Sequence, residues 1–288
     1  MFSMRVLAIA GMAAVLSIPA ARAADLPPII QQAMPAPVDD FASGWYLRGD
    51  VGIGIQDYRS FGHTQTNAAF VWPASWNIQQ KEIKDPAFVG VGIGYQFNNW
   101  LRFDVTGEYR QRVPFLATGN YSGAADFCAG GGQCFDVYNG NHGAAVFLAN
   151  AYFDLGTWWR VTPFIGAGIG TAYNQVTGFW DLGLNSDGTT GRGFARDYSS
   201  WNMAWALYAG LSFNVTHNLK LEAAYRYLNM GDVRTGIVDC VGCGANGPLA
   251  YYTLKELQSH DFKLGFRYMF SQPEPYFPPE PAPLVRKG

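Results

Sequence analysis

The ten residues from Asp261 to Phe270 alternate strictly between two kinds of side chain. The apolar set is Phe262, Leu264, Phe266, Tyr268 and Phe270. The set between them, which carries three charges, is Asp261, Lys263, Gly265, Arg267 and Met269. A period of two belongs to an extended strand and not to a helix. Large apolar groups on one face and charges on the other indicate a strand with lipid on one side and water on the other.

The same alternation recurs in seven earlier segments. These predicted strands span residues 44–56, 87–97, 101–110, 145–155, 161–173, 201–214 and 219–228. Short turns are expected near 98, 156–160 and 215–218, and long loops over 57–86, 111–142, 174–198 and 229–257. This layout predicts an all-β fold, an eight-stranded antiparallel transmembrane barrel of outer-membrane type with long extracellular loops and short periplasmic turns. Closure is expected because lipid cannot hydrogen-bond a free sheet edge.

A soluble β-sandwich or a lipocalin-like barrel would also alternate, with the apolar face as its core. The polar faces of segments 87–97 and 161–173, however, are mostly glycine. Glycine on a solvent face weakens a strand without benefit, whereas inside a narrow barrel it leaves room for long neighbouring side chains. The glycine pattern therefore favours the membrane barrel.

Composition and the two ends of the chain agree with export. Residues 1–23 read as a signal peptide, with an apolar run followed by Ala21-Arg22-Ala23. We expect a proline-rich periplasmic leader at 24–43, the barrel at 44–270 and a proline-rich periplasmic tail at 271–288. The charged fraction is only 15%, and the net charge of −2 gives no indication of nucleic-acid binding.

Four cysteines, Cys128, Cys134, Cys240 and Cys243, suggest disulfides in an exported chain, with three possible pairings. The favoured reading of Cys240-Val-Gly-Cys243 is a local loop staple, since the βαβ context of a redox site is missing. No metal site is predicted, because no histidine lies at ligand spacing beside the cysteines.

Thirteen charged residues are expected to face the lumen, seven basic and six acidic. They are Arg48, Asp50, Arg102, Asp104, Glu108, Arg110, Asp154, Lys220, Glu222, Arg226, Asp261, Lys263 and Arg267. An eight-stranded barrel is just wide enough for side chains, and unpaired buried charges are costly. The near-balance predicts cross-strand ion pairs that fill a closed lumen, or alternatively a gate that passes small ions.

Several segments resemble a known family. Gly44-Trp-Tyr-Leu-Arg-Gly49, Gly90-Val-Gly-Ile-Gly-Tyr95, Asn150-Ala-Tyr-Phe-Asp-Leu155 and the glycine-rich run 162–170 are similar to small porin-family outer-membrane proteins of the RopB-like group, relatives of the OmpA barrel domain. Lys263, Gly265, Tyr268 and Phe270 resemble the C-terminal signal read by the barrel-assembly machinery. The family usually stops at the terminal aromatic, whereas here residues 271–288 follow.

The resulting expectation is a non-enzymatic outer-membrane protein with a structural and surface-interaction role. A narrow porin-like channel is the alternative, and a lipid hydrolase comes third because none of the four histidines lies in a catalytic motif. Expected partners are outer-membrane lipid and lipopolysaccharide, the barrel-assembly machinery and, through the tail, peptidoglycan or another envelope component; no cofactor is expected. Aromatic loop segments 70–76 and 178–180 predict either a self-packed collar or a recognition surface.

Overall fold

The computed structural model describes residues 43–66, 73–122, 128, 132–241 and 250–270. Within these residues every regular element is a β-strand, and no helix is long and apolar enough to cross a membrane. The predicted signal peptide, the leader except for Ser43, and the predicted tail lie outside the described residues.

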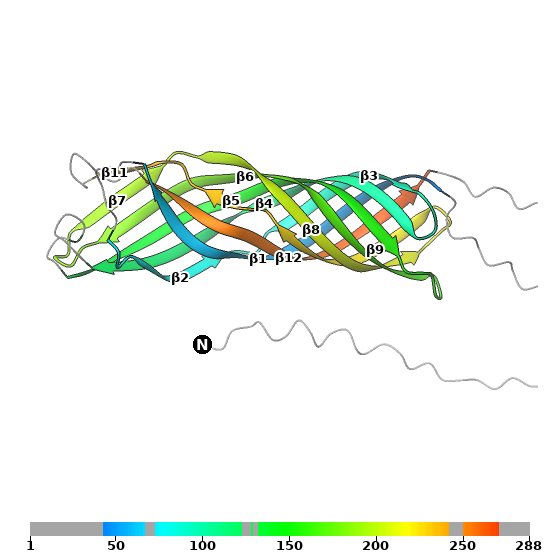
Figure 1. Cartoon of the computed structure of the whole chain (residues 1–288), viewed down its shortest axis with the longest axis horizontal. Coiled ribbons are helices and arrows are strands. Elements are labelled where there is room, and N and C mark those ends of the chain that lie inside the picture. The colour runs from blue at the N-terminus through cyan, green and yellow to red at the C-terminus, as the bar shows by residue number, and fades with distance from the viewer. Residues whose placement is uncertain (1–42, 67–72, 123–127, 129–131, 242–249, 271–288) are drawn as a thin grey trace, which may run out of the picture. The chain divides into compact units, whose positions relative to one another are not determined.

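Eight strands form a closed ring (Figure 1). In ring order they are β1 (Gly44–Gln65), β3 (Ala87–Gln96), β4 (Leu101–Ser122), β5 (Gln133–Asp154), β6 (Val161–Leu184), β8 (Tyr198–Asn214), β9 (Leu219–Asn229) and β12 (Ala250–Met269). Every neighbouring pair is antiparallel, and the pairing of β12 with β1 closes the ring. The predicted eight-stranded antiparallel barrel is confirmed.

The outer surface near the short turns is an apolar band. On β1, Val51 and Ile53 are 56% and 59% exposed, whereas the alternate residues Arg48 and Asp50 are buried. The same division holds on β3, β4, β8 and β12, where valine, leucine, isoleucine and aromatic side chains point outward. An exposed apolar surface that encircles a barrel is stable in contact with hydrocarbon.

Five wall strands are about twice as long as predicted, so the predicted bounds of these strands and of the long loops between them were wrong. β1, β4 and β5 each contain 22 residues, β6 contains 24 and β12 contains 20. A membrane strand needs only about 9–11 residues. The alternation of inward and outward residues continues past the apolar band, but most outward residues there are polar. The sequence then lacks the contrast between apolar outward and polar inward residues that marks a membrane strand.

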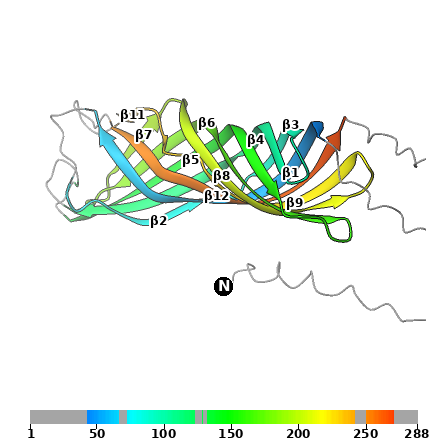
Figure 2. The same cartoon turned by 45° about the vertical axis from the view of Figure 1, so that its right-hand side comes forward.

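We call the wall beyond the apolar band the extension. It comprises residues 57–65, 77–86, 111–122, 133–143, 175–199, 229–241 and 250–259. Four further strands lie in it, namely β2 (Asn77–Ile83), β7 (Thr190–Ala195), β10 (Val233–Arg234) and β11 (Val238–Val241). They pair with β4, β6, β12 and β7 respectively. Figures 1 and 2 show β2, β7 and β11 at one end of the barrel and β3 and β9 toward the other.

Glycines face the lumen where long side chains need space. A Cβ atom at Gly94 would collide with the ring of Tyr46, which is fully buried. A Cβ atom at Gly54 would collide with the guanidinium group of Arg110 and touch the carboxylate of Asp261. The inward glycines are therefore required by packing, as the sequence pattern indicated.

Substituting Gly94 with alanine should destabilise the barrel by about 1–3 kcal/mol, because the added methyl group overpacks the lumen against Tyr46. The measurement is urea unfolding in lipid vesicles, followed by tryptophan fluorescence. Gly62→Ala is the matched control, since its new Cβ atom would meet only Lys255 at 3.7 Å. Equal unfolding midpoints for the two variants would contradict the packing argument.

Candidate functional site

All thirteen charged residues predicted to face the lumen are buried there, each at most 6% exposed. They come from β1, β4, β5, β9 and β12 and lie at the height of the apolar band. Many stand opposite a glycine on the neighbouring strand, as Asp261 stands opposite Gly54 and Asp104 opposite Gly94. The glycine removes the side chain that would otherwise compete for the same space.

Four of these charges form a closed square of alternating sign. Asp261 accepts hydrogen bonds from both terminal nitrogens of Arg110, at 2.9 and 3.0 Å, and from Arg226 Nε at 2.8 Å. Glu108 accepts from Arg226 Nη2 at 2.7 Å and from Arg110 Nη1 at 3.0 Å. Because β4 stands across the lumen from β9 and β12 in the ring, the square ties opposite walls together.

A second cluster, nearer the short turns, gathers around Glu222. Its carboxylate lies 3.1 Å from Arg267 Nε and 3.5 Å from a terminal nitrogen of both Arg48 and Arg102. The Arg102 guanidinium also lies over the Tyr152 ring at 4.2 Å from its centroid. These contacts compensate buried charge by opposite charge and an aromatic face.

Lys263 lies between the two clusters. Its ammonium nitrogen is 3.6 Å from Asp50 and 3.9 Å from Glu108, longer than the arginine contacts. Arg48 binds Asp50 at 2.9 Å and Asp104 at 2.8 Å, which completes the connection from β1 to β4. The result is one network of paired charges along the membrane part of the lumen.

The extension is filled differently, by an aromatic core. Phe61 stacks on Tyr252 with ring centroids 5.4 Å apart, and Tyr138 and Phe179 pack against Tyr252 at 4.7 and 5.4 Å. All four rings are buried. Trp76 donates its indole N–H to the Tyr138 hydroxyl at 3.0 Å. Aromatic packing of this kind stabilises the extension as a folded body and not as a set of loops.

A disulfide joins Cys134 of the extension to Cys128. Cys128 and Cys134 are bonded, with Cα atoms 5.7 Å apart, and both are fully buried beside Tyr121. The predicted Cys240–Cys243 staple cannot be placed in the same way, because Cys243 lies outside the described residues.

Two carboxylates are enclosed in the aromatic core on adjacent strands. Asp136 accepts a hydrogen bond from the Tyr138 hydroxyl at 2.8 Å, and Asp181 accepts one from Tyr252 at 3.3 Å. Burial raises the pKa of Asp136 to about 7, against the lowering effect of the Tyr138 hydrogen bond and with reinforcement from the Asp181 charge. Burial likewise raises the pKa of Asp181. Burial thus favours the neutral form of both carboxyl groups more than it is favoured in an exposed aspartate.

The sequence analysis missed this acidic pair and the core around it because the predicted strands covered 145–155 and 161–173, which left Asp136 and Asp181 in predicted loops. In the structure the even-numbered residues of β5 are buried without a break from Cys134 to Asp154, but among them Asp136 and His142 are polar and give no apolar alternation in the sequence. Of the predicted assembly signal, Tyr268 and Phe270 are exposed on the outer surface, and Lys263 is buried in the lumen. Its role in assembly stays a prediction.

Comparison with known proteins gives a family and several relatives. The family model described as “Outer membrane protein beta-barrel domain” matches residues 10–270. An uncharacterized protein of Brucella suis is 32% identical over 281 residues, covering 88% of this chain and 94% of that protein. A Rickettsia bellii protein named “Putative adhesin” is 26% identical and covers 78% and 87%. The crystal structure of OprG from Pseudomonas aeruginosa has a TM-score of 0.46 at 14% identity, covering 80% of this chain and 97% of that one.

Replacing Asp261 with asparagine should cost about 3–5 kcal/mol of unfolding free energy, because Arg110 and Arg226 would lose their shared buried counter-charge. Unfolding in urea from lipid vesicles measures this loss. Glu256→Gln is the matched control: it removes one partner of the exposed Arg59–Glu256 pair, and a surface pair contributes at most about 1 kcal/mol. Equal losses in both variants would contradict the network's role.

The extension should lose stability as the pH rises through about 7. The pKa of Asp136 is raised in the folded state, so its contribution is fully present below the unfolded value of about 4 and is lost as the pH passes the folded value. Hydrogen exchange of the β5 and β6 backbone amides, corrected for intrinsic rates, measures this. Asp136→Asn should flatten the dependence and Asp239→Asn, an exposed control, should keep it. An unchanged pH profile in Asp136→Asn would exclude this carboxyl as the cause.

Proposed function

Because this chain belongs to the outer membrane protein beta-barrel domain family, we propose that it is a closed structural barrel that presents a stiff extension for interaction at the cell surface. The observation that carries the proposal is the contrast between the two halves of the wall. The membrane half encloses paired charges, and the other half continues as long paired strands around an aromatic core.

The filled lumen supports a structural role over transport. Its charges are engaged by partners on other strands, and moving a solute past them would separate buried ion pairs. Breaking one buried pair costs about 3–5 kcal/mol, and the square around Asp261 contains several. A barrel built this way resists opening.

The extension supports the surface role. Its outer face, mostly polar but with exposed apolar residues on β5, β6 and β7, and its strands of 20 or more residues place a folded wall beyond the lipid. A surface that is already ordered loses little conformational entropy when a partner binds, which favours recognition. The adhesin name of the Rickettsia relative agrees with such a role.

Envelope partners follow from the same reading. Lipid and lipopolysaccharide would contact the apolar band and the base of the extension. The barrel-assembly machinery would read the segment from Lys263 to Phe270, whose aromatic residues Tyr268 and Phe270 are exposed. Residues 271–288 would contact peptidoglycan from the periplasm. Deleting them should reduce sedimentation of the protein with cell walls.

A gated channel is the second candidate, and Lys263 favours it. This ammonium group is held by two longer contacts, at 3.6 and 3.9 Å, between two tighter arginine clusters. A small shift of Lys263 could exchange its partners without dismantling either cluster. The channel would then conduct small ions in brief openings.

We expect the purified full chain to give no conductance steps in planar bilayers at neutral pH, because the charge network closes the lumen. A bacterial strain lacking the protein should in turn adhere less to host surfaces than a strain complemented with the full chain, with its envelope more sensitive to detergent.

The channel candidate replaces the structural one if regular conductance steps appear and change size in the Lys263→Met variant. A trimeric porin inserted under the same conditions controls for the quality of the bilayers. Unchanged adherence and unchanged detergent sensitivity in the deletion strain would remove both parts of the proposed surface and envelope role.

A further inference from the structure

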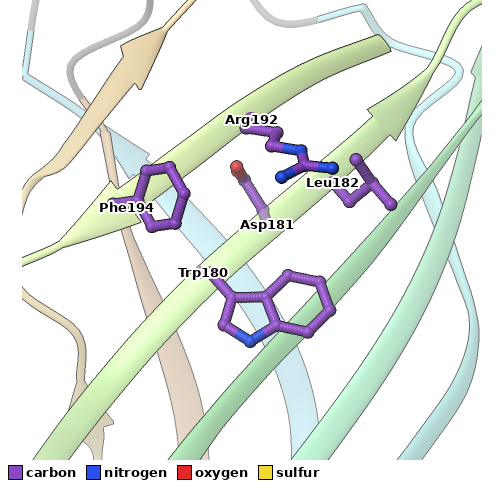
Figure 3. Close-up of a pocket in the computed structure, with 5 residues that line it drawn as sticks. All are labelled: Trp180, Asp181, Leu182, Arg192 and Phe194. Atoms are coloured by element: carbon purple, nitrogen blue, oxygen red, sulfur yellow. The ribbon is translucent and has the colours of Figure 1, made fainter.

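The outer face of the extension contains an apolar groove between β6 and β7. Trp180 and Leu182 of β6 stand directly opposite Phe194 and Arg192 of β7. Together with Asp181 they line a pocket of about 310 Å³. Figure 3 shows the Trp180 and Phe194 rings on either side of Asp181, with the Arg192 guanidinium group extending toward Leu182.

A bulge in the wall produces this groove. The register between β5 and β6 shifts after Asn139, and Gly178 there has a φ of +59°. The extra residues turn Phe179 into the core, where it is 2% exposed, and turn Trp180 outward. Bulges commonly re-aim a side chain in this way. Of the aromatic segment 178–180, predicted as either a self-packed collar or a recognition surface, Phe179 packs into the core and Trp180 faces the groove.

The groove belongs to a wider apolar patch that lies beyond the apolar band. Phe135 and Leu184 are paired across β5 and β6 and are 47% and 46% exposed, and Phe194 is 50% exposed. Along β6, Gln175 and Thr177 separate this patch from the outward residues of the membrane segment. Because these polar residues end the apolar band on β6, we infer that the patch lies beyond the lipid tails and that its exposure calls for another partner.

Charge at the groove defines the chemistry of that partner. Among the described residues, the exposed Arg192 guanidinium has no hydrogen-bond or ion-pair partner. The carboxylate of Asp239, on the adjoining β11, does not pair with it either. The carboxylate of Asp181 is engaged by the Tyr252 hydroxyl. A cation without a partner beside two aromatic walls is complementary to an apolar group followed by an anion.

We propose that this groove docks a protein segment that inserts one large apolar side chain between Trp180 and Phe194 and places a carboxylate against Arg192. Tryptophan and arginine are the residues that most often dominate protein interfaces. The groove stands on rigid paired strands, so it is ordered before the partner arrives. The proposal rests on the surface-interaction role proposed above and gives that role a site and a partner chemistry.

The test is selection of random linear peptides, displayed on phage, against the full chain in lipid nanodiscs. We expect the enriched peptides to contain a large apolar residue next to aspartate or glutamate. Trp180→Ala should abolish their binding, and Arg192→Glu should weaken it about tenfold. Selection against Arg192→Glu should instead enrich lysine or arginine at the same position.

Arg196→Glu is the matched control, since Arg196 is an exposed arginine of the same region outside the groove and its variant should bind the peptides as the wild type does. Heat-modifiable electrophoretic mobility confirms that each variant is folded. Peptides without an acidic residue, equal binding by Arg192→Glu, or no enrichment that depends on Trp180 would each overturn the proposal. The proposal would also be overturned if the full chain bound purified lipopolysaccharide and the Trp180→Ala variant did not.

The same variants separate this proposal from the function on which it rests. A strain carrying Trp180→Ala should adhere as poorly as the deletion strain. If it adheres like the wild type while the deletion strain does not, the groove is excluded and the surface role stands. If the deletion strain also adheres like the wild type, the surface role fails on its own account.

Discussion

Hydrocarbon offers no hydrogen-bond partner to a peptide group, and this single constraint organises the membrane half of the protein. It requires the sheet to close, which the pairing of β12 with β1 achieves. Closure with eight strands leaves an interior only as wide as side chains. The outward residues must then be apolar, and the inward residues must fill a narrow space without leaving a buried charge unpaired.

The two halves of the barrel meet that second demand in different ways. Around Glu108 and Asp261 the space is filled by ion pairs, which keep their register because each guanidinium group must meet its carboxylate. Around Tyr138 and Tyr252 it is filled by stacked rings, which need no register of charge. The outer face of the wall changes with the filling: it is apolar beside the ion pairs and mostly polar beside the rings.

The sequence predicted the ring and the inward charges because both depend on a local period of two with strong contrast, as in Asp261 to Phe270. It failed where contrast fades. Along β1 beyond Ile55 and along β5 before Ala145 most outward residues are polar, so these parts of the strands were predicted as loops. The inward turn of Phe179 also depends on a bulge at Gly178, which arises from pairing with β5 and cannot be read from the spacing of apolar residues.

The pairing of inward glycines with long charged neighbours has a consequence for how such barrels diverge. Gly54 can acquire a side chain only if Arg110 or Asp261 becomes smaller at the same time, because the three share one volume. Sequence change inside the lumen must therefore proceed by linked replacements across strands, whereas outward residues such as Val51 can drift singly among apolar types. Inward-facing residues of the wall therefore change together, whereas outward-facing residues change independently of one another.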